Sequence, residues 1–340
     1  LCQEVDGRYL IQNPPSRYLE ESEMDKIASY PYQRDLHPYH AKDGKVKALE
    51  TIKFSIMTHH GCWGECNYCA IAAHQGRTIR TRSEQNILSE AKHFTTLKDF
   101  KGIISDVGGP TANMYGYECK KKMNLGTCID NKRCVDAHRL CRTMKVDHSR
   151  NIKLLKDIRA IPKVKKAFIA SGIRYDFIAA DKNHGKEYLK EIIDHHISGQ
   201  MKIAPEHTSD EVLHHMGKPG KQSLIEFKKM FDDLNKTSGK KQFLTYYLIA
   251  AHPGCKESHM HELKQFTTHE LKINPEQAQV FTPTPGTYSA VMYYTELDPF
   301  TKKKIFVEKD TLRKERQKEI VVAKKSFCKT KQNSTFGMQG

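Results

Sequence analysis

Three cysteines lie within eight residues in the stretch THHGCWGECNYCAIAAHQG, at Cys62, Cys66 and Cys69. Their spacing is C-x3-C-x2-C, and no fourth cysteine or ligand-spaced histidine completes the set locally. A structural zinc site usually has four ligands, often in CxxC pairs. A ferredoxin-type motif would continue as C-x2-C-x2-C-x3-C-P, which this stretch does not. Three thiolates on one loop can hold three irons of a cubane [4Fe–4S] cluster and leave the fourth iron open. The stretch therefore predicts such a cluster, with zinc or a buried thiol set as the alternative.

An open iron suits a small chelating molecule, and S-adenosylmethionine (SAM) fits because its amino and carboxylate groups can bind one metal ion. Its sulfonium would then lie close enough to accept an electron from the reduced cluster. Cleavage would yield methionine and a 5′-deoxyadenosyl radical, with the protein supplying position and a dry environment. Gly61 and Gly64 leave the backbone free to wrap a cluster. Tyr68 is expected to lie over the adenine.

Predicted strands and helices alternate along most of the chain. We expect strands at 52–57, 102–107, 166–171, 201–204, 242–250 and 278–283, with helices between them, one of which Ser83 would cap. Such alternation indicates parallel βαβ units, whose chemistry sits at the carboxyl ends of the strands. Unusual stretches follow the strands directly, among them the cysteine loop, 108–110, 171–172 and 204–207. The predicted fold is α/β, a partial parallel (β/α)6 barrel.

The predicted core spans residues 51–300. An irregular N-terminal lead-in occupies 1–50, and a basic C-terminal extension with an exposed helix occupies 301–340. The chain does not begin with Met, so we expect it to be part of a longer protein. It has no apolar run of membrane-spanning length and no signal peptide pattern, so the expected location is cytoplasmic, without membrane contact.

A cysteine-rich insert at about 113–150 interrupts the alternation, with Cys119, Cys128, Cys134 and Cys141 in a Lys/Arg-rich segment. The segment has too little apolar periodicity to order itself by burial, whereas metal binding would supply folding energy. The four thiols predict a second [4Fe–4S] cluster. Zinc and free thiols remain alternatives, although zinc ribbons usually have tight CxxC pairs.

The charge of the chain favours anionic partners. Lys and Arg outnumber Asp and Glu by 56 to 40, and the formal net charge is +16. Such a balance is typical of proteins that attract nucleic acid, but it also occurs on ordinary solvated surfaces. RNA is therefore a possible substrate or partner.

The chain resembles the radical SAM superfamily, and more closely the YgiQ-type proteins, a bacterial family of poorly defined function. The motifs that carry the resemblance, besides the cysteine loop, are RYLIQNPP (8–15), GRTIRTRSE (76–84), GIISDVGGPTANMYG (102–116), IASGIRYD (169–176), KIAPEHT (202–208), HPG (252–254) and MYYT (292–295). The resemblance covers nearly the whole chain, and family members extend further at both ends.

The resemblance implies which residues bind SAM: Gly108, Gly109, Ser171, Arg174 and Glu206. The glycine pair would receive the SAM amino group, Ser171 and Arg174 its carboxylate or ribose, and Glu206 the ribose or a substrate. Pro110 stands where many members have Glu, which puts one polar contact in doubt.

The function implied is a radical SAM enzyme that cleaves SAM reductively and acts on an unknown substrate, supplied with electrons by a donor such as flavodoxin or ferredoxin. The alternative is an iron–sulfur electron-transfer or scaffold protein that does not cleave SAM.

Overall fold

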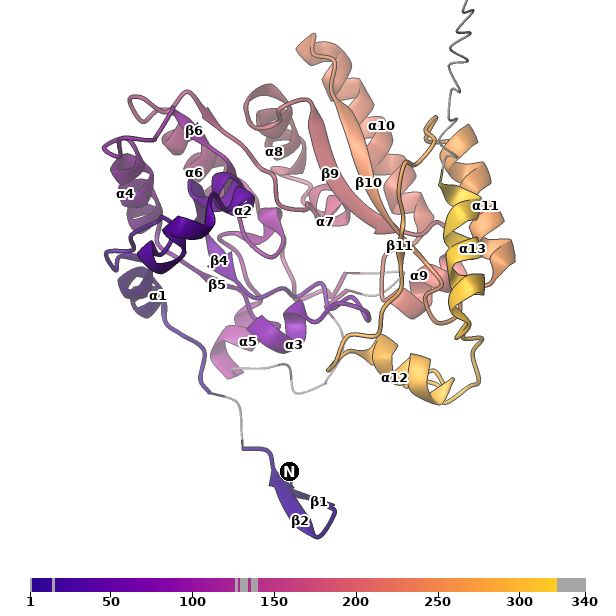
Figure 1. Ribbon diagram of the computed structural model, residues 1–340. Coiled ribbons are helices and arrows are strands. Elements are labelled where there is room, and N and C mark those ends of the chain that lie inside the picture. Colours follow the sequence, from indigo (N-terminus) through magenta and orange to yellow (C-terminus); the bar gives the residue numbers. More distant parts are fainter. Residues whose placement is uncertain (1, 14–15, 126–127, 129–133, 136–139, 323–340) are drawn as a thin grey trace, which may run out of the picture.

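The computed structural model describes residues 2–13, 16–125, 128, 134–135 and 140–322 (Figure 1). Its central strands are β3 (Ser55–Met57), β6 (Ile103–Ile104), β7 (Asp106–Gly108), β8 (Lys166–Ala167), β9 (Gln200–Glu206), β10 (Phe243–Ala250) and β11 (Gln279–Val280). All six predicted strand regions are therefore present, and they begin within a few residues of the expected positions.

The strand regions lie side by side in chain order. The pairs β3–β7, β6–β8, β9–β10 and β10–β11 are all parallel. A parallel bridge between Ile173 and Ile203 joins the segment after β8 to β9. Parallel strands connected by helices confirm the α/β class. No pairing joins β11 back to β3 among the described residues.

The third strand is shorter than the predicted 166–171. Its regular part ends at Ala167, because the chain beyond it turns its amides toward a neighbouring carboxylate. Asp106 Oδ1 accepts hydrogen bonds from the backbone N–H of Ala170 at 2.8 Å and of Ser171 at 3.1 Å. A side chain thus satisfies amides that a longer ladder would have paired.

Helices cover one face of the strands. Those between and after the central strands are α4 (Glu84–Phe94), α6 (Ser149–Arg159), α7 (Tyr175–Ala180), α8 (Gly185–Glu191), the π-helical turn η3 (Ile192–His196), α9 (Asp210–Met216), α10 (Lys221–Ser238) and α11 (Glu257–His269). As predicted, Ser83 caps α4, where its side chain accepts a hydrogen bond from Asn86 N at 3.1 Å. In Figure 1, α7, α8 and α10 lie behind the strands.

Apolar side chains of the strands and helices form one large core. Met201 and Ile203 of β9 are buried together with Phe227 and Phe231 of α10. Because strand side chains alternate between faces, this packing assigns the odd-numbered positions of β9 to the helix side of the sheet. The other face is the one seen from the front in Figure 1.

The N-terminal lead-in is not irregular as predicted. It forms a hairpin of β1 (Cys2–Val5) and β2 (Arg8–Ile11), then α1 (Glu21–Ala28), the short 3₁₀ helix η1 (Pro38–Asp43) and α2 (Lys47–Ile52). A capping box between Glu20 and Glu23 starts α1, and Met24 is its buried residue. Sequence periodicity missed these elements because each is short and buries at most one side chain.

The C-terminal helix was expected to be exposed, and that expectation is wrong for one of its faces. In α13 (Thr311–Val321), Gln317 and Val321 are 3% and 0% exposed. The side-chain oxygen of Gln317 accepts a hydrogen bond from Ala251 N at 3.1 Å, just beyond β10. These are the two fully buried positions of α13, whereas Lys314 and Ile320 are partly buried against the body. Because one of the two buried residues is polar, the buried face leaves no hydrophobic pattern in the sequence. The remainder of the predicted helix, residues 323–325, lies outside the described residues.

The shorter remaining elements are β4 (His59–His60), β5 (Arg80–Thr81), α3 (Ile71–Gln75), η2 (Ala112–Met114), α5 (Lys120–Leu125) and α12 (Tyr288–Thr295). Within the described part of the chain, no helix has the length and apolar character needed to cross a membrane.

Candidate functional site

The cysteine loop connects β4 to α3 and is held by its own backbone. Cys62 N donates to the carbonyl of Gly76 at 3.1 Å, and Cys69 N donates to that of Cys66 at 3.0 Å. Gly61 starts the turn with φ +84°, and a Cβ there would lie 2.3 Å from the carbonyl oxygen of Thr78. Only glycine fits this position, because both the backbone angle and the close approach exclude a side chain.

Replacing Gly61 with Ala should therefore displace the loop and reduce iron incorporation. A non-glycine residue in the left-handed region costs about 1–2 kcal/mol, and the contact with Thr78 adds to this. Gly239→Ala is the matched control, since Gly239 has φ +66° but open space around its Cβ position. Iron and sulfide content after anaerobic reconstitution is the measurement. Equal loading of the two variants would contradict the steric argument.

A cavity of about 190 Å³ lies beside the loop. The three cysteines form one wall, and residues at or after the ends of strands, together with Lys218 after α9, form the others. Among the latter are Pro110, Thr111, Gly172, Arg174, Ala204, Glu206 and Lys218. The carboxyl ends of the strands therefore meet the cysteine loop at one cavity, as the strand-then-loop pattern predicts. Burial raises the pKa of the Cys69 thiol to about 11, although the nearby Lys218 acts against this.

Arg174 brings a buried positive charge to the cysteines. Its side chain is 7% exposed, and its Nη1 lies 3.5 Å from the sulfur of Cys66. Nε and Nη2 donate to the two carboxylate oxygens of Asp176 at 2.8 and 2.6 Å, so the guanidinium is held by a bidentate pair. Gly64 leaves room for it, since a Cβ there would lie 2.7 Å from Nη1. The arrangement favours thiolate, or a negatively charged cluster, next to Cys66.

Three polar side chains, those of Tyr68, Glu206 and Lys218, meet at the same cavity. The hydroxyl of Tyr68 donates to Glu206 Oε1 at 2.9 Å. Lys218 is 2% exposed, and one of its N–H groups donates to the carbonyl of Ala204 at 2.5 Å. Burial raises the pKa of the Glu206 carboxyl, an effect opposed by Lys218, by the bond from Tyr68 and by Arg174. Buried charges of both signs at one cavity are typical of a site for a zwitterionic ligand.

The glycine pair and Ser171 lie next to this cavity but do not line it. A Cβ on Gly108 would lie 2.6 Å from Ser171 Oγ, and one on Gly109 would lie 2.6 Å from His59 Cε1. The hydroxyl of Ser171 donates to Asp106. The glycines thus permit close strand packing, and Ser171 holds Asp106. Their predicted contacts with SAM stay predictions, as do those of Tyr68, Arg174 and Glu206.

Sequence reasoning missed three residues of the site: Thr111, Asp176 and Lys218. Thr111 Oγ1 lies 3.5 Å from the sulfur of Cys62. Thr111 follows Pro110, which offers no polar side chain where many family members have Glu. Asp176 is two residues from Arg174 and could have been paired with it. Lys218 is one of many lysines, and nothing in its local sequence distinguishes a buried lysine from an exposed one.

The described cysteines of the insert are partly ordered by packing, contrary to the expectation that the segment buries too little to order itself. Cys119 and Cys134 are buried at 5% and 8% exposure, and both belong to an apolar cluster with Trp63 of the cysteine loop. The hydroxyl of Thr143 lies 3.5 Å from the sulfur of Cys119 and 3.2 Å from that of Cys141. Most of the residues around Cys128 lie outside the described residues, so the full set of four cannot be compared.

Trp63 lies between the two cysteine groups and has an unusual environment. Its side chain is 0% exposed, stacks on Phe177 at 4.2 Å between ring centroids, and meets Tyr117 edge-on at 5.7 Å. Among the described residues, none accepts a hydrogen bond from its indole N–H. Burying a hydrogen-bond donor without an acceptor costs free energy. The sulfur atoms of a bound cluster would provide the missing acceptor.

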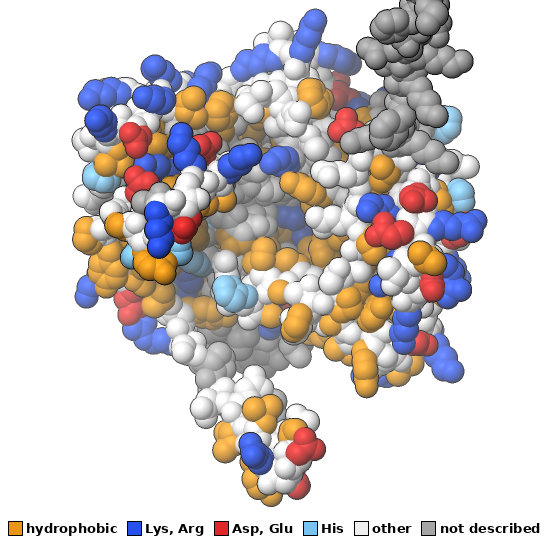
Figure 2. Space-filling model, viewed as in Figure 1, with side chains coloured by type: hydrophobic (Ala, Val, Ile, Leu, Met, Phe, Trp, Pro, Cys, Tyr) orange, Lys and Arg blue, Asp and Glu red, His pale blue; other side chains and the backbone are white. Residues whose placement is uncertain are grey.

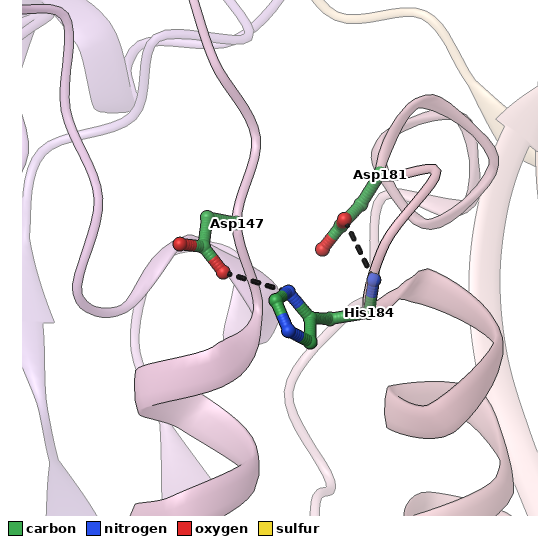
Figure 3. Close-up of side chains that lie close together, drawn as sticks. All are labelled: Asp147, Asp181 and His184. Carbon is green, nitrogen blue, oxygen red and sulfur yellow. Dashed lines mark hydrogen bonds and ion pairs between the residues drawn. The ribbon is translucent and has the colours of Figure 1, made fainter.

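One group outside the cavity has the composition of a metal site. Asp147, Asp181 and His184 have ligand atoms within 4.8 Å of one another (Figure 3). However, Asp181 Oδ1 accepts from the backbone of Asn183 and His184, and Oδ2 accepts from His148 N and Nδ1, both at 2.8 Å. The carboxylate is already saturated by the turn it closes, so the group is a structural cap.

The arrangement of three thiols and buried charges around one cavity agrees with a family comparison. The model of the radical SAM superfamily matches residues 56–267, which is more than half of the chain, and a radical SAM N-terminal model matches residues 1–55. The chain belongs to the radical SAM superfamily. The resemblance stated from the sequence is therefore confirmed.

Relatives of this radical SAM protein carry the name UPF0313, in agreement with the YgiQ-type resemblance. UPF0313 protein FN0734 of Fusobacterium nucleatum is 59% identical over 325 residues, which cover 96% of this chain and 57% of the relative. A UPF0313 protein of Clostridium perfringens is 44% identical and is covered to 48%. The chain thus spans about half the length of the curated relatives it matches.

Solved radical SAM structures resemble the fold distantly. The methyltransferase TsrM from Kitasatospora setae, with cobalamin and a [4Fe–4S] cluster bound, superposes with a TM-score of 0.42 at 10% identity, covering 70% of this chain and 38% of TsrM. The cobalamin-dependent enzyme OxsB gives 0.41 at 14% identity, covering 73% and 30%. Similarity at this level does not bear on the substrate of this chain.

Proposed function

We propose that this chain is the core of a radical SAM enzyme that binds a [4Fe–4S] cluster through Cys62, Cys66 and Cys69. When bound, the reduced cluster would supply the electron that cleaves SAM to methionine and a 5′-deoxyadenosyl radical, which then acts on a further substrate. The observation that carries the proposal is the single cavity with three cysteines on one wall and buried groups of both charges on the others. The residues present fit both groups, because the loop offers three thiols and SAM has both cationic and anionic ends.

The polar side chains have separable roles in this proposal. Lys218 uses one N–H for Ala204, so its remaining two can donate to the SAM carboxylate. Glu206, held by Tyr68, can accept from the ribose hydroxyls or the SAM ammonium. Pro110 cannot make the contact that Glu makes in many family members, so Thr111 is the nearest replacement on that wall. Arg174 stabilises negative charge at the cysteines.

The strand order is consistent with a partial (β/α)6 barrel open between β11 and β3. In the same proposal, a flavodoxin or ferredoxin in the cytoplasm would supply the electrons. The cysteine loop is accessible for this, since a second cavity of about 350 Å³ on its other side is lined by Cys66, Cys69 and Arg77.

The test is the product formed from SAM. Reconstituted protein reduced with dithionite should convert SAM to 5′-deoxyadenosine and methionine, detected by liquid chromatography and mass spectrometry. SAM should also change the electron paramagnetic resonance spectrum of the reduced cluster. An electron-transfer or scaffold protein would show the cluster signal without any change on adding SAM, and that result would reject the enzyme.

A second metal centre in the insert belongs to the same proposal. Cys119, Cys134 and Cys141 approach one another around Trp63 and Thr143, and the unpaired indole N–H suits a cluster sulfur. Hydrogen bonds to sulfur tune the potential of such clusters.

If the insert holds its own cluster, the Cys62, Cys66 and Cys69 triple Ala variant should retain about one cluster of iron and sulfide per chain, because its ligands are untouched. Metal and sulfide analysis after anaerobic reconstitution measures this. Zinc without sulfide would favour the zinc alternative, and loss of all metal would reject both. Replacing Trp63 with Phe should shift the reduction potential of the retained cluster without removing it.

A further inference from the structure

Among the residues that the structure describes, no helix covers one face of the central sheet. Parallel sheets are usually buried on both faces, yet Met57, Ile103, Phe243 and Tyr247 are 48%, 46%, 55% and 41% exposed. Lys202 in the middle of β9 is exposed as well. We call the surface formed by these five residues the concave face. Figure 2 shows a hollow in the middle of this view, between the side of α1 and α2 and that of β10 and β11.

The direction of these side chains follows from strand alternation. Met201, Ile203 and Leu244 point into the core with α10, so Lys202 and its cross-strand partner Thr245 point the opposite way. Tyr247 is exposed, while Leu248 is buried in a second apolar cluster. Lys202 and Tyr247 therefore share the uncovered side of two neighbouring strands.

The concave face leads directly into the cavity beside the cysteines. Ala204 lines that cavity and lies two residues after Lys202, on the same side of β9. At about 3.3 Å of rise per residue, their Cα atoms are roughly 7 Å apart. Tyr247 lies one residue before Leu248, which pairs with Glu206 at the cavity. The ring of Tyr247 thus lies near the cavity. Lys202, whose strand partner is Thr245, lies further from the cavity along the strands.

The charges on the concave face favour an anionic ligand. Lys166, at the start of β8, adds a second exposed cation to this side. Asp106 is a carboxylate on the same side of β7, but Ala170 and Ser171 occupy its oxygens. These donors are neutral, so Asp106 keeps its charge, but the two lysines outnumber it and the net charge of these three residues is positive.

We propose that the concave face binds the substrate and that the substrate is a nucleotide unit, with its base against Tyr247 and its phosphate at Lys202. Stacking on an exposed aromatic ring beside a cation is how proteins hold single nucleotides and single-stranded RNA. The geometry puts the sugar or base of that unit next to the cavity where a SAM-derived radical would form. The inference rests on the proposed function for its chemistry, but the binding itself does not require SAM cleavage.

Binding is measured on the reconstituted full chain without SAM or reductant, so that its failure is distinct from a failure of SAM cleavage. The probes are the four free nucleoside 5′-monophosphates, by calorimetry, and a fluorescein-labelled ten-residue single-stranded RNA of mixed sequence, by anisotropy. Tyr247→Leu should weaken binding about tenfold through lost stacking. Lys202→Gln should weaken it about tenfold through a lost charged hydrogen bond.

Lys229→Gln is the matched control, because Lys229 is exposed on α10, on the opposite side of the sheet. It should change affinity less than twofold. For the RNA probe, Lys202→Gln should also reduce the slope of log affinity against log salt by about 0.7, the value for one phosphate contact on a single strand.

The two probes distinguish the sources of the nucleotide. Binding of monophosphates that is insensitive to Lys166→Gln indicates a free nucleotide. Binding of the RNA alone, weakened by Lys166→Gln, indicates a strand that runs along the face. Absence of binding to both probes overturns the proposal. So does equal weakening by Lys202→Gln and Lys229→Gln, which would show that only general charge is involved. Thermal melting of each variant confirms that it is folded.

Discussion

Cys66→Ala should reduce 5′-deoxyadenosine formation to the level of metal-free protein. Cys66 is the middle one of the three proposed ligands, and its sulfur is the one that Arg174 approaches at 3.5 Å. Removing it leaves two thiols, which cannot hold a cubane with one open iron. Product formation from SAM, together with iron content and the reduced-cluster spectrum, measures the effect.

Cys2→Ala provides the control for this variant. Cys2 lies in the exposed β1–β2 hairpin, so its loss should leave SAM cleavage unchanged. Cleavage by Cys66→Ala at the wild-type rate would reject the assignment of the loop. Loss of activity in both variants would point instead to a general effect of lowering the thiol content.

Arg174→Met should lower the free energy of unfolding by about 3–5 kcal/mol, because it leaves the carboxylate of Asp176 buried without its partner. The Asp176 side chain is 11% exposed and accepts two hydrogen bonds from the guanidinium. The variant also removes the positive charge next to Cys66. Urea unfolding under anaerobic conditions measures the stability, and iron content measures the second effect.

The double variant Arg174→Met with Asp176→Asn separates these two effects. It removes both charges, so most of the stability should return. Iron content should stay low if the guanidinium contributes to cluster binding. If Arg174→Met alone costs less than 1 kcal/mol, the pair is not the buried bidentate contact described here.

The alternation of strands and helices could be predicted from the sequence because it depends on the local periodicity of apolar residues. The helix cap at Ser83 follows directly from the capping rules, and the structure has it where it was predicted. The elements of the lead-in and the buried face of α13 were missed. In these elements only one or two side chains are fully buried, and so few buried positions leave no periodic signal.

In the candidate site, too, some features could be predicted from the sequence and others could not. The cysteine spacing predicted that Cys62, Cys66 and Cys69 act together, and the family resemblance implied that Arg174 and Glu206 lie near them. The cavity brings all five residues together. The placement of Ser171 away from the cavity was not predictable, because it depends on Asp106 of another strand. The same holds for Lys218, whose burial is set by the packing of the loop after α9.

The sequence by itself determined the superfamily, the order of the strands and the residues that can ligate a cluster, because these depend on spacing along the chain. The tertiary structure alone decided which charges are buried together, as with Arg174 and Asp176. It also decided that Lys202 and Tyr247 are exposed on one face of the sheet, which no described helix covers. Burial and pairing across strands depend on segments far apart in the chain, and no local pattern records where those segments meet.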